Sequence, residues 1–298
     1  MAKAKHTINQ HYIPQTYLKG FSSDSKHVYE FNLTKDAPIV KPVDISSICR
    51  DKYIYEVRDE HGELINPNYI ENKLSEYERQ FTEHRNLLLS KASIKENYQT
   101  RSFLSREEKN FWIFYAALNI MRNPITLNGM QKIFGDEFNG RLSEQEARNL
   151  AVAYCLPFFK EPDEHEMNAF VFFIQVLLQK VLIVGYSEEG NLFTSDHAMY
   201  GAANKKVIIF PQFGRLWFPI TSNCGLIYCD PELTNRSNRN RLIPIFEDEV
   251  RELNKGIAYI ASQMVLSKYP FSKEDIDLIQ EARRERAEDD LNQTVLIN

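Results

Sequence analysis

The spacing of apolar residues changes twice along the chain. The first sixty residues contain short strand-like stretches at 27–33 and 52–57, with a turn predicted at His61-Gly62. From about 67 to 180 apolar residues recur at helical spacing. The clearest stripe is Ile70, Leu74, Tyr77, Phe81 and Leu88. Strand-like stretches return after 180, and helical spacing resumes from 246.

Helix start and stop signals divide the middle of the chain. Asn66-Pro67 reads as an N-cap followed by proline at the first helical position. Two capping boxes, Ser105–Glu108 and Ser143–Glu146, predict two further helix starts. Pro124 is expected to stop the helix that Ser105 opens. Asp163 or Glu164 is expected to start an apolar helix that leads into a strand.

The last third predicts strands followed by helices. Residues 181–187 and 192–196 are expected to form a hairpin around the turn Glu188–Asn191. Further strands are expected at 206–213, 215–221 and 225–229. The spacing of Val250, Leu253, Ile257, Ile260 and Met264 predicts a helix, and a charged helix is expected at 273 to about 290.

These elements predict an α+β fold in one domain, 1–298. A large helical insertion, 67–180, separates two sets of strands that share a mixed, mainly antiparallel sheet, and helices end the chain. The sequence has no internal repeat and no low-complexity linker.

Composition narrows the class of protein. The chain is 43% hydrophobic and 26% charged, as in ordinary globular proteins, and its net charge of -5 disfavours nucleic-acid binding through overall positive charge. No apolar run follows the first lysines, so no secretory signal is expected. The longest apolar run, 169–184, is too short and too polar for a membrane span. Four scattered cysteines fit neither a zinc site nor a disulfide framework, which indicates a reduced, cytoplasmic protein.

The segment "HYIPQTYLKGF", 11–21, is the first candidate for chemistry. Its apolar residues are expected to anchor it to the body of the protein, and Pro14 keeps Ile13 extended. His11 and Gln15 would then be presented to a site. A hydrophobic latch with an incidental histidine is an equal alternative.

Carboxylates on the helix after residue 70 are the second candidate. Glu71 and Glu78 share a helix face but lie about 10.5 Å apart along its axis, so direct ligation of one metal ion by both is disfavoured. One of the two glutamates could act as a base or metal ligand while the other holds an arginine, and Glu71 is the candidate base or metal ligand. The alternative is a solvated flank of the helix.

Arg122, in "MRNP", is the third candidate. It lies in the last turn of a predicted helix, where a cation stabilises the negative dipole end. The same helix is rich in aromatic residues, which indicates burial, and a buried guanidinium requires a carboxylate or phosphate partner.

The stretch "FTSDHA", 193–198, places Ser195, Asp196 and His197 where a strand meets a loop. Three adjacent residues do not form a Ser-His-Asp relay, because that relay needs side chains converging from different segments. Asp196 is a candidate metal ligand together with Glu71. The alternative is an Asx or Ser turn that closes a hairpin.

A polar loop, "NRSNRNR" at 235–241, carries Arg236, Arg239 and Arg241. These arginines are candidates for gripping phosphate or nucleic acid. The alternative is an ordinary solvated loop, since no aromatic residue is interleaved.

The order of several segments resembles the bacterial domain-of-unknown-function family 4238. They are "HYIPQTYLKGF", the glutamate helix after 70, "NIMRNP", "LFTSDHA", "WFPIT" and "ELNKGIAYIAS", and they span nearly the whole chain. The resemblance implies that His11, Gln15, Arg122, Ser195 and Asp196 match the positions of the family pattern. Asn123 stands where the pattern has Thr, and His197-Ala198 where it has Asn-Pro. The family implies no settled activity.

Three functions are compatible with these residues. The first is a nuclease-like hydrolase of a phosphodiester or nucleotide, with a divalent metal as a candidate cofactor, His11 as acid or base, and Arg122 stabilising negative charge. The second is a nucleotide- or nucleic-acid-binding sensor without catalysis. The third is a protein-interaction component that docks through its charged C-terminal helix, 273–298. The sequence predicts no oligomeric state.

Overall fold

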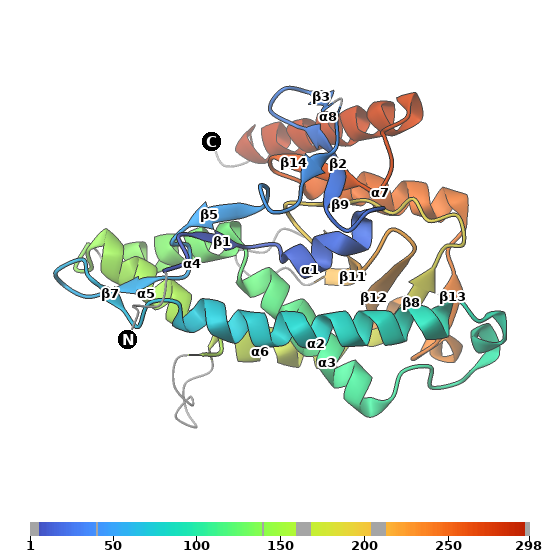
Figure 1. Cartoon of the computed structure of the whole chain (residues 1–298), viewed down its shortest axis with the longest axis horizontal. Helices are drawn as coiled ribbons and strands as arrows, with labels where there is room; N and C mark the ends of the chain where they lie inside the picture. Colours follow the sequence, from blue (N-terminus) through green and yellow to red (C-terminus); the bar gives the residue numbers. More distant parts are fainter. Residues whose placement is uncertain (1–5, 40, 139, 159–167, 204–212, 296–298) are drawn as a thin grey trace.

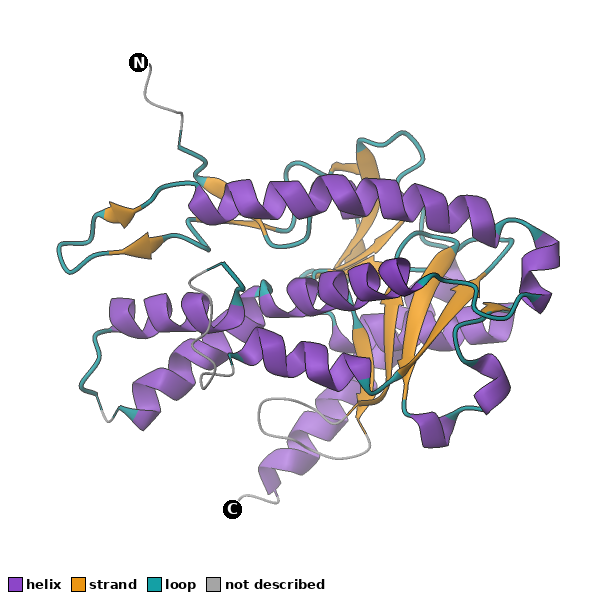
Figure 2. Cartoon of the chain, turned by 90° about the horizontal axis from the view of Figure 1, so that it is seen from below, coloured by secondary structure: helices purple, strands orange, loops and turns teal. Residues whose placement is uncertain are grey.

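The computed structural model describes residues 6–39, 41–138, 140–158, 168–203 and 213–295 (Figure 1). The helices of the middle of the chain lie side by side in one half of the molecule, and the strands fan out beside them (Figure 2). The last two long helices lie on the side of the strands away from the long helix of the middle region (Figure 1).

Eight α-helices occur among the described residues. They are α1 (Gln15–Leu18), α2 (Tyr69–Ala92), α3 (Arg106–Met121), α4 (Pro124–Glu137), α5 (Glu144–Cys155), α6 (Ala169–Leu178), α7 (Glu247–Ile260) and α8 (Lys273–Val295). Four short 3-10 turns also occur among the described residues, namely η1 (Lys19–Phe21), η2 (Lys95–Gln99), η3 (Pro231–Leu233) and η4 (Arg236–Asn238).

The strands before the helices are short. They are β1 (Asn9–His11), β2 (His27–Asn32), β3 (Ala37–Pro38), β4 (Val43–Asp44), β5 (Arg50–Lys52), β6 (Val57–Arg58) and β7 (Leu64–Ile65). The strands after residue 180 are β8 (Val181–Tyr186), β9 (Thr194–Ser195), β10 (Tyr200–Ala203), β11 (Phe213–Pro219), β12 (Cys224–Cys229), β13 (Leu242–Pro244) and β14 (Met264–Ser267).

Two five-stranded sheets carry the α+β fold. One, in the order β10-β11-β12-β8-β13, comes entirely from the part after 180, and only its β13–β8 pair is parallel among the described pairs. In the other, β2 pairs with β14, β14 pairs with β9, and β3 and β4 both pair with β2. Strands from both ends of the chain therefore share a sheet across the helical region, as predicted.

The main core joins the helices to both sheets. Aromatic rings dominate it, with Phe81 stacked on Tyr115 at 4.5 Å and Tyr17 stacked on Phe218 at 5.7 Å. A second cluster lies under α7 and α8 and contains Phe193, Trp217 and Ile279. The C-terminal helix thus packs on the body through one face, although its sequence is charged on nearly all sides.

The helix signals give mixed results. Both capping boxes form, with Ser105 and Ser143 each accepting the N–H of the glutamate three residues on. The predicted start at Asn66-Pro67 is wrong by two residues: α2 begins after Asn68, because both Asn66 (φ 50°) and Asn68 (φ 65°) take left-handed backbone. Helix α3 ends before Pro124, as predicted. Pro124 is also the first residue of α4, with Asn123 as its N-cap.

Two strand predictions are also wrong. The stretch 52–57 breaks after β5, because Tyr53 has φ 54° and Tyr55 turns inward to meet Arg122. Strands β8 and β9 form no hairpin: the chain crosses between sheets, and the Asn254 side chain bonds Phe193 N–H and Asn191 C=O on the way.

Some boundaries differ from expectation or lie outside the described residues. Helix α7 ends at Ile260, so Met264 begins β14 instead of continuing the helix. The starts at Asp163 or Glu164, and most of the predicted strand 206–213, fall outside the described ranges. Helix α6 begins after Asn168, whose side chain accepts the Val171 N–H.

Candidate functional site

Arg122 is the centre of a buried ionic cluster. It ends α3 and is 1% exposed. Its Nε donates to the Tyr55 hydroxyl (3.2 Å), Nη1 to Glu78 Oε1 (3.1 Å) and Nη2 to the His11 carbonyl (2.5 Å). The Tyr55 hydroxyl donates in turn to the Arg122 carbonyl (3.1 Å). Each guanidinium nitrogen therefore has a protein acceptor, and Arg122 positions the opening segment on α2 and α3.

The opening segment is anchored as predicted. Tyr12, Ile13, Tyr17, Leu18 and Phe21 are all buried, and the Tyr17 hydroxyl bonds Thr194 and the Pro219 carbonyl at 2.8 Å each. Gln15 is half-buried and begins α1.

The environment of the His11 imidazole disfavours its protonated form. Its Nε2 is buried and has no hydrogen-bond partner among the described residues. Burial lowers the pKa of His11, and the charges of Arg122 and Arg50 add to this against a backbone hydrogen bond with Ser46. The ring is therefore neutral at pH 7.

Glu71 is the unusual carboxylate of the cluster. Its Oε2 is buried without a partner among the described residues. Burial raises the pKa of Glu71 to about 7; the Arg122 charge opposes the shift, whereas Glu78 and Glu56 add to it. Glu78 therefore pairs with the arginine, whereas Glu71 is half-protonated near neutrality.

Replacement of Arg122 by Met is expected to destabilise the protein by about 3–5 kcal/mol, because the His11 carbonyl and Glu78 lose their buried partner. Urea unfolding measures the change. The control Arg79→Met removes an exposed pair with Glu83 on α2 and is expected to cost about 0.5 kcal/mol or less. A loss below about 1 kcal/mol for Arg122→Met contradicts the structural role.

Glu71→Gln is expected to flatten the pH dependence of stability. The folded pKa of about 7 lies above the ordinary 4.5, so the wild type loses stability as pH rises from 4.5 to about 7, where the folded state binds more protons. The variant should match the wild type near pH 5 and exceed its stability at pH 8, by urea unfolding at both pH values. The exposed Glu83→Gln serves as the control. Parallel pH profiles of wild type and Glu71→Gln contradict the prediction.

Asp196 closes a turn with both carboxylate oxygens. Oδ1 accepts the N–H of Ser262 (3.0 Å) and Oδ2 that of Gln263 (2.9 Å), while its carbonyl accepts from Asn123 Nδ2 (3.0 Å). Next to it, the Ser195 hydroxyl bonds both the N–H and the carbonyl of His197. Ser195 thus makes a local Ser turn, whereas Asp196 bonds the loop after α7, 66 and 67 positions away, and closes no hairpin.

The neighbours of Asp196 also bear on the predicted metal site. Asp196 bonds the loop after α7, whereas Glu71 lies in the Arg122 cluster on α2, so the two carboxylates are held by different partners. Within the described ranges, no three His, Cys, Asp or Glu side chains gather in a group that could hold a metal ion. The donor set therefore does not favour joint ligation by Asp196 and Glu71.

Asp196→Ala is expected to cost about 2 kcal/mol or more, because two backbone N–H groups lose their acceptor. Thermal and urea unfolding measure the loss, which should be the same in EDTA and in millimolar Mg²⁺ or Mn²⁺. Asp196→Asn keeps one acceptor oxygen and should cost less. Stabilisation by metal in the wild type that Asp196→Ala abolishes contradicts the turn role.

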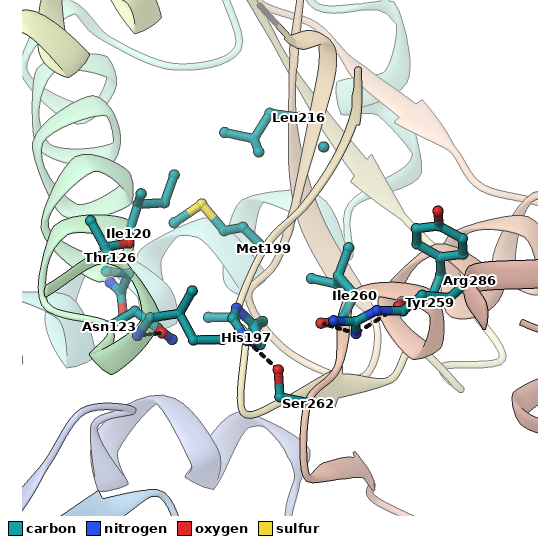
Figure 3. A pocket seen from close by; sticks show the side chains of 14 residues that line it. Ile120, Asn123, Thr126, His197, Met199, Leu216, Tyr259, Ile260, Ser262 and Arg286 are labelled. Carbon is teal, nitrogen blue, oxygen red and sulfur yellow. Dashed lines mark hydrogen bonds between the residues drawn. The ribbon is translucent and has the colours of Figure 1, made fainter. Parts of the chain in front are cut away.

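A cavity of about 380 Å³ lies between the α3–α4 corner, strands β10 and β11, and the end of α7 (Figure 3). Its apolar walls include Ile120, Met199, Leu216 and Ile260. On one side His197 points at Ser262, with 3.1 Å between Nε2 and Oγ (Figure 3). A histidine and a hydroxyl within hydrogen-bond reach are the parts of an activated nucleophile.

Electrostatics keep this histidine neutral. Burial lowers the pKa of His197; Asp196 opposes the shift and the Arg286 charge adds to it. Arg286, on α8, lines the cavity while its Nη1 donates to the last carbonyls of α7, the closest being Ala261 at 2.8 Å. The cavity thus combines a neutral imidazole, which can accept a proton, with the positive charge of Arg286.

Asn119 adds an acceptor to the same wall. It is 3% exposed, and its Nδ2 donates to the Tyr115 carbonyl (2.8 Å), which fixes the orientation of the amide. Its Oδ1 has no hydrogen-bond partner among the described residues. A buried acceptor of this kind favours a ligand that carries an N–H or O–H group.

The sequence candidates divide into three places. His11, Glu71 and Arg122 meet in the ionic cluster, and His197 lines the cavity with Ser195 and Asp196 shaping its turn. The predicted arginine loop lies elsewhere: Arg236 begins η4, Arg239 is exposed and Arg241 half-buried, and neither Arg239 nor Arg241 lines the cavity.

Sequence reasoning missed Asn119 and Ser262 as site residues. Both lie in segments that carry the family resemblance, "NIMRNP" and "ELNKGIAYIAS". Each is a polar residue beside buried apolar residues. A polar residue among apolar ones could have indicated a site residue in each segment. Only the fold, however, brings Asn119 and Ser262 to one cavity.

The described residues thus form an α+β fold with a buried cluster around Arg122 and a cavity lined by His197 and Ser262. The chain belongs to the family of proteins of unknown function DUF4238, whose model matches residues 9–270. No curated protein and no solved structure gives a match. Within the described residues, no helix is long and apolar enough to cross a membrane.

Proposed function

We propose that the protein is a hydrolase of a phosphoester of the nucleotide class, acting in the cavity beside His197. The observation that carries the proposal is the 3.1 Å contact between His197 Nε2 and Ser262 Oγ on the cavity wall. The pair comes from two distant segments, as in active sites assembled from separate parts of a chain.

The residues support a two-step displacement. Neutral His197 accepts the Ser262 hydroxyl proton at Nε2 while Oγ bonds to phosphorus and the leaving alcohol departs, taking the proton from the imidazolium. His197 then takes a proton from water as the water oxygen bonds to phosphorus, and the imidazolium gives this proton to Ser262 Oγ as the Oγ–phosphorus bond breaks. The charge of Arg286 attracts the anionic substrate to this wall.

No residue in this scheme ligates a metal, since Asp196 uses both carboxylate oxygens on backbone amides. The role of Asp196 is to hold the Ser262 backbone in place. His11 and Arg122, assigned to acid–base and charge-stabilising roles from sequence, support the α3–α4 corner in this scheme.

The second candidate, ligand binding without catalysis, is favoured by Asn119. Its unpartnered Oδ1 suits the N–H edge of a nucleobase, and the apolar walls suit the faces of a flat ring. Binding of adenosine or cytidine without turnover of any phosphoester distinguishes this candidate.

Ser262→Ala and His197→Asn are each expected to lower kcat at least about 100-fold, because each removes one half of the nucleophile–base pair. The assay follows release of p-nitrophenol from bis(p-nitrophenyl) phosphate and from thymidine 5′-p-nitrophenyl phosphate. Activity of the wild type should rise with pH through the lowered pKa of His197, since the neutral ring is the active form.

The family pattern has Asn at position 197, so His197→Asn is compatible with the turn that Ser195 forms there. The exposed His61→Asn is the matched control and should keep full activity. Wild-type-like kcat in both site variants, with intact thermal unfolding, rules out the hydrolase at this cavity.

A further inference from the structure

A second recessed surface lies at the other end of α7. A cavity of about 560 Å³ there is lined by three aromatic side chains, Tyr98, Tyr186 and Phe246. Four carboxylates share its lining, namely Glu188, Glu189, Glu247 and Asp248. Phe246 is 68% exposed, more than any other large apolar side chain in the described ranges. An aromatic ring left in water among carboxylates is unfavourable unless something covers it.

An adjoining cavity of about 550 Å³ continues this surface, and the two share Ile245 and Asp248. Its floor includes Tyr200 and Trp217 on neighbouring strands, and Glu249 and Glu252 of α7 stand beside it. We call the combined recess the α7 groove, defined by Tyr98, Tyr186, Trp217, Phe246, Asp248 and Glu252.

Trp217 supplies an independent sign of a missing partner. It is 3% exposed, and its Nε1 has no hydrogen-bond acceptor among the described residues. Its six-membered ring packs against Gly225, where a Cβ would lie 2.2 Å from Cη2, and Trp217 lines the second cavity. A buried indole N–H without an acceptor is costly, and a carbonyl oxygen of a ligand would satisfy it.

Among the described residues that line the two cavities, the charged side chains are six carboxylates and Arg215. Of the cations nearby, Lys95 pairs with Glu188 at 3.0 Å, and Arg215 donates to the Leu233 carbonyl at 3.1 Å. Asp248 and Glu252 are exposed, and neither forms an ion pair within the described residues. A groove with carboxylates above aromatic rings favours a cation, because both groups attract positive charge.

We propose that the α7 groove binds an extended segment of a partner protein that is rich in arginine or lysine. Its cationic side chains pair with Asp248 and Glu252 and lie over Tyr98 and Phe246, and a backbone carbonyl accepts the Trp217 N–H. A polyamine or a metal ion offers no such carbonyl, so a peptide fits the groove better. This places the protein-interaction surface beside α7, not on the packed helix α8.

The test measures binding of a fluorescein-labelled peptide Gly-Arg-Gly-Arg-Gly-Arg-Gly-Arg by anisotropy, with the Glu analogue as the negative probe. Phe246→Ser removes the exposed ring and supplies a better N-cap for α7, so the fold is preserved. It should weaken binding at least about tenfold. Trp217→Phe keeps the ring and removes the N–H, and should weaken binding about fivefold.

The double variant Asp248→Asn/Glu252→Gln should weaken binding at least about tenfold. Asp136→Asn/Glu137→Gln removes the same charge from the exposed end of α4 and should leave binding within about twofold. Equal losses in both double variants indicate attraction to net charge only and overturn the proposal. Wild-type affinity in Phe246→Ser and Trp217→Phe, or no binding of the arginine peptide, overturns it as well.

Discussion

The structure depends on burying one guanidinium. Arg122 ends an aromatic-rich helix at 1% exposure, and such a charge is stable only with close acceptors on every side. Helix α2 provides Glu78, the turn after β5 provides the Tyr55 hydroxyl, and the opening segment provides a carbonyl. Three segments far apart in sequence must therefore meet at one point, and the bond from Arg122 to the His11 carbonyl holds the segment 11–21 there.

That point also sets the geometry of the cavity. Asn123, the residue after Arg122, caps α4 and donates to the Asp196 carbonyl. The Asp196 carboxylate holds the amides of Ser262 and Gln263, and Ser262 contacts His197. A continuous series of short hydrogen bonds thus runs from the buried cluster to the histidine–serine pair. Arg122 and Asp196, candidate catalytic residues from sequence, use their charged groups in these hydrogen bonds.

The sequence predicted an element correctly where the residues that determine it lie within one short segment. Both capping boxes and the passage from α6 into β8 follow from residues within one or two turns. The strand at 52–57 and the hairpin of β8 with β9 failed because their outcome depends on distant groups. Tyr55 is drawn to Arg122, and Asn254 redirects the chain at Asn191. The candidate site shows the same division. His197 was visible as a polar residue at a strand end, whereas its partner Ser262 lies 65 positions away and no spacing rule connects them.

Helix α7 links the two surfaces to which we assign functions. Its last turn and the following loop form a wall of the His197 cavity, and its first turn borders the groove around Phe246. Fourteen residues separate the surfaces by only about 20 Å of rigid helix. Between them Gly256 lies against the Tyr200 ring so closely that a Cβ would be 2.3 Å from it, so α7 packs directly on β10. Because Tyr200 lines the α7 groove and follows His197 by three residues, this one contact between α7 and β10 lies between the two surfaces.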